Sequence, residues 1–521
     1  MHGRVDLAPA PAALARRRAL PLAPLLFGLA LVCAALLALP GRTVTTIYVN
    51  DLLIFLDGAH RILWGQVPNR DFHTALGPLV YLLPAAALAL TGSPGAAMPI
   101  AMAAWILLLA PAIVHVATTR LRPPLALAAG AFLILMLAVP MNLGESVTAL
   151  SFAMFYNRVG WAALGALLLM YLTPAAPAPR QGARDVACAT FLTLAMLYTK
   201  VSYGAVAVGF LVFLLLDRAH RAVAATALVL VAAAGLLVEL AWGGTAAHVA
   251  DLALASRVSG TTPTAREFVD IALRDLPGLV LFALAGALAL WRSRSLRDLL
   301  FFGFCAVAGF LLIRQNFQLV GIMTLPVAAA VAAELIARSA PDPRPVRGPD
   351  LVVLAMVLPL AAQWVLGLGL HAGLAAARAG EPFRMERFRA IHLVPLWSGP
   401  AFPSMAFYAR TLDAGAEALA GLEPPAERVF VLDFVSPFSA GLGLRPPRGD
   451  SAWQHWGRTV DWGLFVPPER LLADVDVIME PKAPVEEWTA NGLRRIYAPY
   501  LEANFRIVRE TPLWWVWRRA R

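Results

Sequence analysis

Long apolar runs separated by short polar loops fill the first 370 residues of the chain. The first run, 19–40, is about 20 residues long, which is enough to cross a hydrocarbon layer of ~30 Å. We expect it to be an anchor and not a cleaved signal peptide, because Leu37–Leu39 is a poor cleavage site. Further apolar runs lie at 96–118, 125–141, 159–173, 185–199, 201–216, 222–242, 277–291, 298–313, 318–337 and 351–370. The pattern predicts an all-α polytopic membrane protein with about 11 spanning helices.

One more apolar run, 76–91, is ambiguous because Gly77 and Pro78 lie at its start and Gly92 follows it. The basic loops decide its placement, since cytoplasmic loops carry an excess of arginine. If 76–91 does not cross the membrane, the later basic loops fall on the side of Arg16–Arg18. Their arginines are Arg120, Arg122, Arg180, Arg184, Arg218, Arg221, Arg292, Arg294, Arg297, Arg338, Arg344 and Arg347. We therefore expect 76–91 to be a juxtamembrane helix, lying in the interface or entering partway.

This topology places the N-terminus in the cytoplasm and the C-terminus outside. The predicted parts are a cytoplasmic segment, 1–18, a transmembrane domain, 19–370, and an extracytoplasmic region, 371–521. Outer loops are expected at 42–95, 142–158 and 243–276. In the last region, alternating segments at 428–434, 475–479 and 514–518 predict strands. With a helix expected at 493–505, kinked or interrupted by Pro499, they predict a small α/β domain at about 425–521.

The composition agrees with a membrane protein and excludes other classes. Only 15% of the residues are charged and 59% are hydrophobic. A soluble domain is about one quarter charged, and a disordered chain is far less apolar. The net charge of +10 reflects arginine-rich loops, and no basic run interleaved with aromatic residues indicates a nucleic-acid groove. Cys33, Cys188 and Cys305 are far apart and show no metal-binding spacing.

The first outer loop predicts a helix from Asp51 to Trp64 that Gly65 ends. One face of this helix carries Leu52, Phe55, Leu56, Ala59 and Leu63. An amphipathic helix of this kind lies along a membrane surface, with Asp51 at its N-terminal end near the first span. Asp51 is therefore either a functional carboxylate or the N-cap of the helix, a position that aspartate favours.

The same loop contains a loose motif. Its positions are Asp51, Ala59–Gly65, Pro68, Asp71–Phe72 and Gly77–Tyr81. The motif resembles the first periplasmic loop of the GT-C glycosyltransferases, such as the protein mannosyltransferases and the lipid A aminoarabinose transferases. The layout of the chain, with juxtamembrane helices and a small outer C-terminal domain, is similar as well.

The resemblance implies an enzyme that uses polyprenyl-phosphate-linked sugars. Asp51 is then the base that takes the proton from the acceptor hydroxyl. Asp71 and His73 complete or orient the site, and Asp51 and Asp71 are the ligands if a divalent metal, Mg²⁺ or Mn²⁺, is used. One departure bears on the metal, because many members have two adjacent acids where Asp51 is followed by Leu52. For His73, a solvated loop residue is the alternative interpretation.

The second outer loop offers Glu145, its only acid, and Arg158 at the start of the next span. An ionisable group bordering a span is costly unless it faces protein or water. Family members often place a second acid in this loop, so Glu145 is expected to support the site and Arg158 to bind an anion. A structural pair of Glu145 with Arg158, or an interfacial anchor, explains the same residues.

Two cations lie at the outer ends of spans, where the positive-inside rule makes them uncommon. Lys200 joins two apolar runs, and Arg314 opens the polar stretch Arg314–Gln318. We expect both to bind the phosphate of the donor, with snorkelling anchors as the alternative. His60 and Arg61 are weaker candidates for substrate binding.

The outer domain contains a cluster of aromatic and polar residues. They are Trp453, His455, Trp456, Arg458, Asp461 and Trp462. Aromatic residues with polar neighbours suit sugar stacking, but docking to the membrane or a role in the core is the favoured interpretation.

Together these features predict a multi-pass glycosyltransferase, transferring a hexose or a pentose, in the bacterial plasma (inner) membrane. Its expected partners are a polyprenyl-phosphate-linked donor, membrane lipids and a cell-envelope acceptor (a glycan, a lipid or a protein), and no nucleic acid. A transporter or lipid flippase, which would show inverted repeats and acids buried in mid-span, is one alternative. An envelope polysaccharide polymerase or ligase is another.

Overall fold

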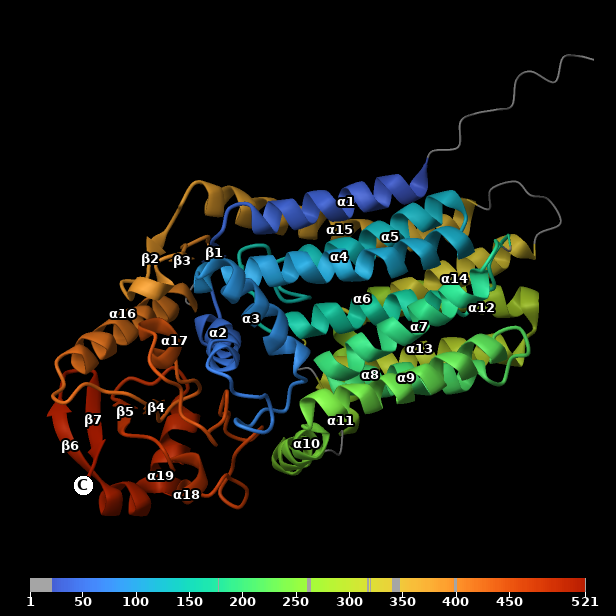
Figure 1. Ribbon diagram of the computed structural model, residues 1–521. Coiled ribbons are helices and arrows are strands. Elements are labelled where there is room, and N and C mark those ends of the chain that lie inside the picture. The colour runs from blue at the N-terminus through green and yellow to red at the C-terminus, as the bar shows by residue number, and fades with distance from the viewer. Residues whose placement is uncertain are drawn as a thin grey trace, which may run out of the picture.

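The computed structural model describes residues 21–176, 178–259, 264–315, 318, 320–339, 347–397 and 401–520. A helical bundle makes up one part of the molecule, and a smaller domain with β-strands lies at one end of it (Figure 1). The predicted cytoplasmic segment with Arg16–Arg18 and the loop residue Arg344 lie outside the described residues.

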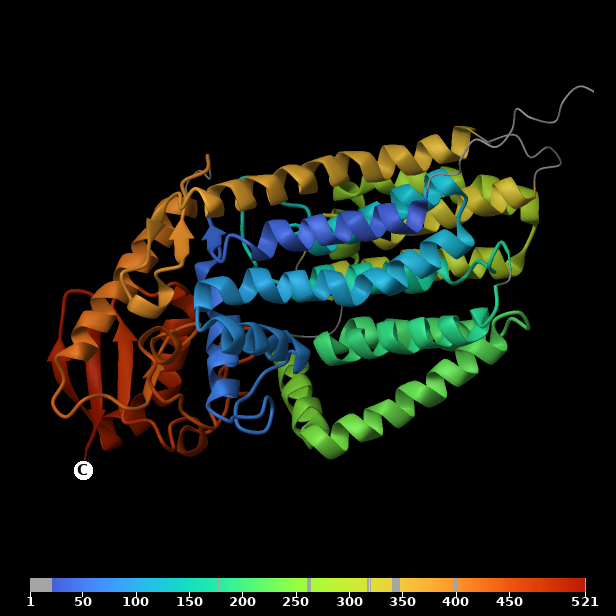
Figure 2. The same ribbon diagram turned by 45° about the horizontal axis from the view of Figure 1, so that its top comes forward.

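Long apolar helices run side by side along the axis of the bundle (Figures 1 and 2). They are α1 (Leu22–Ala38), α4 (Pro94–Arg120), α5 (Pro123–Ala138), α6 (Phe155–Leu169), α7 (Gln181–Thr199), α8 (Val201–Leu214), α9 (Arg221–Trp242), α12 (Leu276–Ser293), α13 (Leu296–Gln315), α14 (Thr324–Arg338) and α15 (Arg347–Ala376). Five of the described helices are long and apolar enough to cross a membrane: α4, α9, α12, α13 and Gly348–Ala376 of α15. The chain is therefore a multi-pass membrane protein, as predicted, while the expected number of spans stays a prediction.

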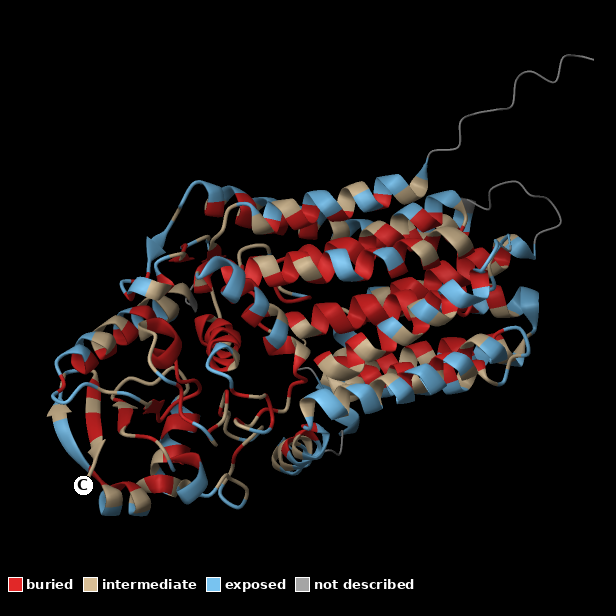
Figure 3. Ribbon diagram, in the orientation of Figure 1, coloured by how far each residue is buried: buried red, intermediate tan, exposed pale blue. Residues whose placement is uncertain are grey.

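Burial differs sharply between the helices of the bundle (Figure 3). Every residue of α6 except Tyr156 is buried, whereas α9 exposes large apolar side chains such as Leu236, Leu237 and Leu240. Helices that are apolar on their exposed side are stable where lipid surrounds them. The bundle thus has a packed centre and a rim suited to hydrocarbon.

The segment between α1 and α4 stays at the end of the bundle that faces the smaller domain (Figure 2). It contains β1 (Thr43–Thr45), α2 (Val49–Leu63) and α3 (Leu79–Thr91). The Thr43 hydroxyl donates to the Gly95 carbonyl over 2.7 Å, which joins the end of α1 to the start of α4. Residues 39–93 therefore leave the bundle and return to it at the same end.

Helix α2 is not a surface helix, and this corrects the expectation from its amphipathic pattern. Its polar face is buried against the C-terminal domain, and its apolar residue Leu63 is 46% exposed. The buried Arg61 guanidinium contacts Asp57 (Nε–Oδ2, 2.6 Å) and Asp450 (Nη1–Oδ1, 2.5 Å). The pattern could not reveal this, because Asp450 lies far away in the sequence.

Two small sheets connect the remaining segments. The first has the order β1-β3-β2, with β3 (Ile391–Leu393) parallel to β1 and antiparallel to β2 (Glu381–Pro382). The second has the order β4-β5-β7-β6 and comprises β4 (Val429–Val431), β5 (Val477–Pro481), β6 (Phe505–Glu510) and β7 (Trp514–Arg519). Strand β5 is parallel to β4 and antiparallel to β7. The predicted strands are thus present, in a small C-terminal α/β domain.

Helices complete this end of the molecule. They are α10 (Thr245–Ser259), α11 (Ala265–Arg274), the 3₁₀ turn η1 (Glu386–Phe388), α16 (Ala401–Ala420), α17 (Phe438–Leu442), α18 (Pro468–Leu471) and α19 (Glu487–Asn504). The helix expected at 493–505 is α19, which starts earlier and continues through Pro499. The strand β6, directly after it, was not expected, because its residues are mostly exposed and show no clean alternation.

Candidate functional site

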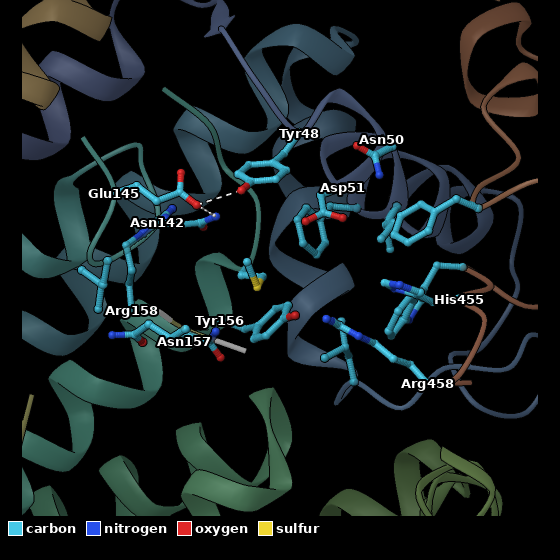
Figure 4. A pocket seen from close by; sticks show the side chains of 18 of the residues that line it. Tyr48, Asn50, Asp51, Asn142, Glu145, Tyr156, Asn157, Arg158, His455 and Arg458 are labelled. Carbon is cyan, nitrogen blue, oxygen red and sulfur yellow. Dashed lines mark hydrogen bonds between the residues drawn. The ribbon is translucent and has the colours of Figure 1, made fainter. Parts of the chain in front are cut away.

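A polar cavity of about 310 Å³ lies where α2, the 142–158 loop and the C-terminal domain meet (Figure 4). Its polar lining comprises Tyr48, Asn50, Asp51, Asn142, Glu145, Tyr156, Asn157, Arg158, Gln318, His455, Arg458 and Glu486. The membrane part and the C-terminal domain both contribute, so neither part forms the cavity alone.

Asp51 lies in the first turn of α2 and faces this cavity. The residue at the N-cap is Tyr48, in a left-handed conformation (φ 57°), so Asp51 is not the N-cap. Burial raises the pKa of Asp51 to about 7, the charge of Arg458 lowers it, and the carboxylates of Glu486 and Glu145 raise it. A carboxylate with a pKa near neutrality is suited to accept a proton.

Two basic residues belong to this part of the site, and Arg458 is the one whose charge acts on Asp51. Arg458 comes from the C-terminal domain, and Figure 4 shows it reaching toward Tyr156 from the side of His455. The Lys200 Nζ contacts Asn157 Oδ1 at 3.4 Å and lies 4.9 Å from the centre of the Tyr156 ring. Lys200 and Arg458 are close enough for their charges to repel each other. Two cations held together in this way favour an anion between them.

Glu145 and Arg158 occupy the other end of the cavity (Figure 4). The Tyr48 hydroxyl donates to Glu145 Oε1 over 2.9 Å, and Asn142 Nδ2 donates to the same oxygen over 3.3 Å. Burial raises the pKa of Glu145, and the hydrogen bonds from Tyr48 and Asn142 lower it. Arg158 is almost fully buried, and its Nη1 donates to the Met141 carbonyl over 2.7 Å. Glu145 and Arg158 thus bond other groups and do not form an ion pair with each other. The alternative that the two residues are a structural pair does not apply.

A second, apolar cavity of about 700 Å³ lies between α2, α3, α4, α7 and α9. It is lined by Leu79, Leu82, Leu83, Trp105, Phe191, Leu194, Tyr198, Val238 and Trp242, among others. The wall between the two cavities consists of two short segments. Leu76 lines the polar cavity and Pro78 the apolar one, and the Gly77 N–H donates to the Thr199 carbonyl beside Lys200. The polar and apolar cavities are thus neighbours across residues 76–78 and 198–200.

No family model matches the chain. No curated protein matches it either. Among solved structures, it is similar to ArnT from Cupriavidus metallidurans bound to undecaprenyl phosphate, with 15% identity, a TM-score of 0.47 and coverage of 95% of this chain and 97% of that chain. It is also similar to the apo state of the same protein, with 14% identity and a TM-score of 0.45 over the same shares.

A third similar structure is the archaeal oligosaccharyltransferase AglB from Archaeoglobus fulgidus, in complex with an inhibitory peptide and a dolichol-phosphate. The identity is 12% and the TM-score 0.39, with coverage of 88% of this chain and 69% of that chain. Both similarities are distant.

Among the residues expected to act together, the structure brings Asp51, Glu145 and Arg158 to the polar cavity, with Lys200 beside it. It does not bring Asp71 or His73 there. Asp71 Oδ2 accepts the Val67 N–H over 2.8 Å. The His73 Nδ1 lies 2.7 Å from Asp251 Oδ1, beside a separate small pocket. The Asp71 side chain holds the turn at residues 67–71, and the His73 ring joins this segment to Asp251 of α10.

Arg61 and Arg314 also lie outside the polar cavity. Arg61 is fully buried between Asp57 and Asp450, so it joins α2 to the C-terminal domain. The Arg314 Nε lies 3.2 Å from Glu267 Oε2 of α11. Neither side chain lines the cavity, so the structure gives no support to a role for them in phosphate binding.

The sequence did not single out Tyr48, Asn142, Tyr156 or Glu486. The cluster around Trp453 did carry a signal, but docking or a core role was favoured for it, whereas Trp453, His455 and Arg458 line the cavity. Aromatic residues beside a histidine and an arginine in the C-terminal region were the available indication of a ligand site.

A divalent metal would need several ligands grouped around one point. Within the described part of the chain, no group of three or more His, Cys, Asp or Glu residues is placed to hold a metal ion. The proposed pair of Asp51 and Asp71 does not assemble, because Asp71 is bonded to the Val67 backbone outside the cavity. The expected pair of ligands is therefore not formed, and a divalent metal stays a prediction from the resemblance.

Proposed function

We propose that this chain is a membrane glycosyltransferase of GT-C type that takes a hexose or a pentose from a polyprenyl-phosphate-linked donor. The acceptor is a cell-envelope glycan, lipid or protein, and the transfer takes place at the outer face of the bacterial plasma membrane. One observation carries the proposal: a polar cavity with a carboxylate and two nearby cations adjoins an apolar cavity within the membrane part.

The apolar cavity suits the lipid part of such a donor. Its lining is aliphatic and aromatic, and its volume of about 700 Å³ is large enough for several isoprene units. The wall between the cavities ends at Lys200, so a phosphate at the head of the lipid would reach the cations there. The lipid tail would thus lie in the apolar cavity and the charged head beside the polar one.

The polar cavity suits the transfer itself. The oxygen of an acceptor hydroxyl attacks the anomeric carbon of the sugar, and the bond from that carbon to the phosphate oxygen breaks. Asp51 takes the hydroxyl proton, and Lys200 and Arg458 stabilise the negative charge that develops on the leaving phosphate. The products are the glycosylated acceptor and the polyprenyl phosphate.

The test is transfer of radiolabelled sugar from polyprenyl-phosphate donors into acceptors in membranes that contain the protein. We expect Asp51→Asn to lower the rate by about 100-fold or more, since general-base catalysis contributes that much. Asp71→Asn is the matched control, because this carboxylate lies on the same loop but outside the cavity. Wild-type activity in stably inserted Asp51→Asn protein would disprove the assignment of the base.

Absence of transfer from every donor would contradict the proposed class of enzyme. A lipid flippase or transporter would instead move the labelled lipid across vesicle membranes without transferring its sugar. Counter-flow measurements on the same vesicles distinguish these results.

A further inference from the structure

The end of the polar cavity away from Asp51 contains a buried arginine whose bonding is incomplete (Figure 4). Arg158 is 1% exposed, and its Nη1 is bonded to the Met141 carbonyl. Its Nε and Nη2 are buried and have no partner among the described residues. These two nitrogens form one edge of the guanidinium and point their N–H groups in parallel, as in bidentate binding.

Unpaired acceptors line the same cavity. Glu145 Oε1 is fixed by the Tyr48 hydroxyl and by Asn142, while Oε2 is buried and has no partner within the described ranges. The Asn142 Oδ1 is also buried and has no hydrogen-bond partner among the described residues. The Glu145 backbone carbonyl accepts a bond from Gln363 over 2.6 Å, so the loop that carries these acceptors is anchored to α15.

Buried polar groups are nearly always hydrogen-bonded in native proteins, so this set of donors and acceptors indicates a ligand. A phosphate offers only acceptors and would put its charge beside the Glu145 carboxylate. A pair of hydroxyl groups accepts from Arg158 and donates to Glu145 and Asn142 at the same time. We infer that Arg158, Glu145 and Asn142 form a saccharide subsite that binds adjacent hydroxyl groups of a sugar ring.

This inference rests on the proposed function and sharpens it. It assigns Arg158 to the sugar, whereas the sequence suggested an anion for it. The phosphate then belongs to Lys200 and Arg458, near Asp51. The sugar ring is either the one carried by the donor or one at the end of a glycan acceptor, and the test below distinguishes them.

The experiment compares binding to the purified full chain in lipid nanodiscs. The first probe is a short-chain polyprenyl phosphate, and the second is the same lipid carrying glucose, mannose or arabinose. Affinity is measured by quenching of tryptophan fluorescence, since Trp453 lines the cavity. The third probe is a set of methyl glycosides and their deoxy analogues, followed by saturation-transfer NMR.

If the subsite binds the donor sugar, Arg158→Gln and Glu145→Gln weaken binding of a glycosylated lipid by about tenfold or more and leave the plain lipid phosphate unchanged. If it binds the acceptor, both lipids bind as before, and the methyl glycoside signal is lost in the variants. Equal loss for the plain and the glycosylated lipid would assign Arg158 to the phosphate and overturn the inference. So would unchanged binding of every probe by both variants.

Two controls keep these outcomes separate from misfolding and from failure of the proposed function. Arg314→Gln removes a guanidinium that lies outside the cavity and should change no affinity. Arg158→Lys retains the charge but not the two parallel N–H donors. It should therefore weaken binding of the glycosylated lipid as much as Arg158→Gln does. If the wild-type protein binds neither lipid, the proposed donor class fails, and the glycoside experiment still tests the subsite.

Discussion

Asp51 is the residue on which the proposed chemistry depends, and its surroundings shift its pKa in opposite directions. Burial and the carboxylates of Glu486 and Glu145 raise its pKa, and Arg458 lowers it, with a result of about 7. The base is then about half ionised at neutral pH. Its activity is set as much by the C-terminal domain, which supplies Glu486 and Arg458, as by α2.

We predict that kcat/KM for sugar transfer rises with pH as Asp51 loses its proton and falls again as Lys200 loses its own, because burial and the charge of Arg458 lower the pKa of Lys200 to about 7. Arg458→Gln removes the cation that lowers this pKa, so the acidic limb should move to higher pH. Glu486→Gln removes a carboxylate that raises it, so the limb should move to lower pH. Rate profiles from pH 5 to 9 measure both, and shifts in the same direction would show that Asp51 is not the titrating base.

The residues of the site differed in how far the sequence could reveal them. Glu145 and Arg158 were found because they border a span, where an ionisable group is costly, and Asp51 because it fits the motif of the 45–81 segment. Asp71 lies in the same loop, but its carboxylate turns back to the Val67 N–H, a local bond that no spacing reveals. Arg458 enters the cavity from a distant domain, and only folding shows that it faces Asp51.

At the scale of elements, α2 determines how the two parts of the molecule fit together. It carries Asp51 at one end and the buried Arg61 near the other, and Arg61 is bonded to Asp450 of the C-terminal domain. Arg61 also bonds Asp57, so one guanidinium contacts two carboxyl groups, and burial raises the pKa of both. The same helix therefore positions the base and binds the C-terminal domain.

We predict that Arg61→Met destabilises the protein by about 3–5 kcal/mol, because it leaves Asp57 and Asp450 buried without a counter-charge. The triple variant Arg61→Met, Asp57→Asn, Asp450→Asn should recover most of this loss, since no buried charge remains. Denaturant unfolding in mild detergent, followed by tryptophan fluorescence, measures the difference. If the triple variant were no more stable than the single one, the charges would not be the cause.

At Gly77 the wall between the two cavities is formed by two backbone segments that lie very close together. A Cβ at this position would lie 2.1 Å from the Tyr198 carbonyl oxygen, which is backbone and cannot rotate away. We predict that Gly77→Ala pushes residues 198–200 away and lowers sugar transfer by about tenfold or more, because small misplacements of a site are costly. Gly28→Ala in α1, where a Cβ meets nothing within 4 Å, is the control and should leave transfer unchanged.

The elements themselves were predictable to different degrees. The long apolar runs and the periodic segment of α2 appear as helices, because burial of an apolar face is a local property of the sequence. The pairing of β1 with β3 joins Thr43 to Ile391, which are far apart in the sequence, and three-residue strands have too few positions to show a period. Short strands that depend on distant partners could not be recognised in advance.

At the scale of the whole molecule, the two ends of the bundle differ in the charged residues that they contain. The site and the C-terminal domain lie at one end (Figure 1). The other end contains arginine ion pairs such as Arg120–Asp185, Arg122–Asp350 and Arg297–Asp217. Arginines in the short loops between spans are typical of the cytoplasmic side, which supports an outer location for the site.

We predict that the C-terminal domain faces outward and the arginine-rich end faces the cytoplasm. Single cysteines test this after Cys33, Cys188 and Cys305 are replaced by serine. Glu469→Cys lies on the exposed side of α18, and Arg218→Cys lies on the exposed loop between α8 and α9. A membrane-impermeant thiol reagent should label position 469 in intact cells, and position 218 only after permeabilisation. The reverse pattern would place the polar cavity in the cytoplasm, where a donor displayed on the outer leaflet could not reach Asp51.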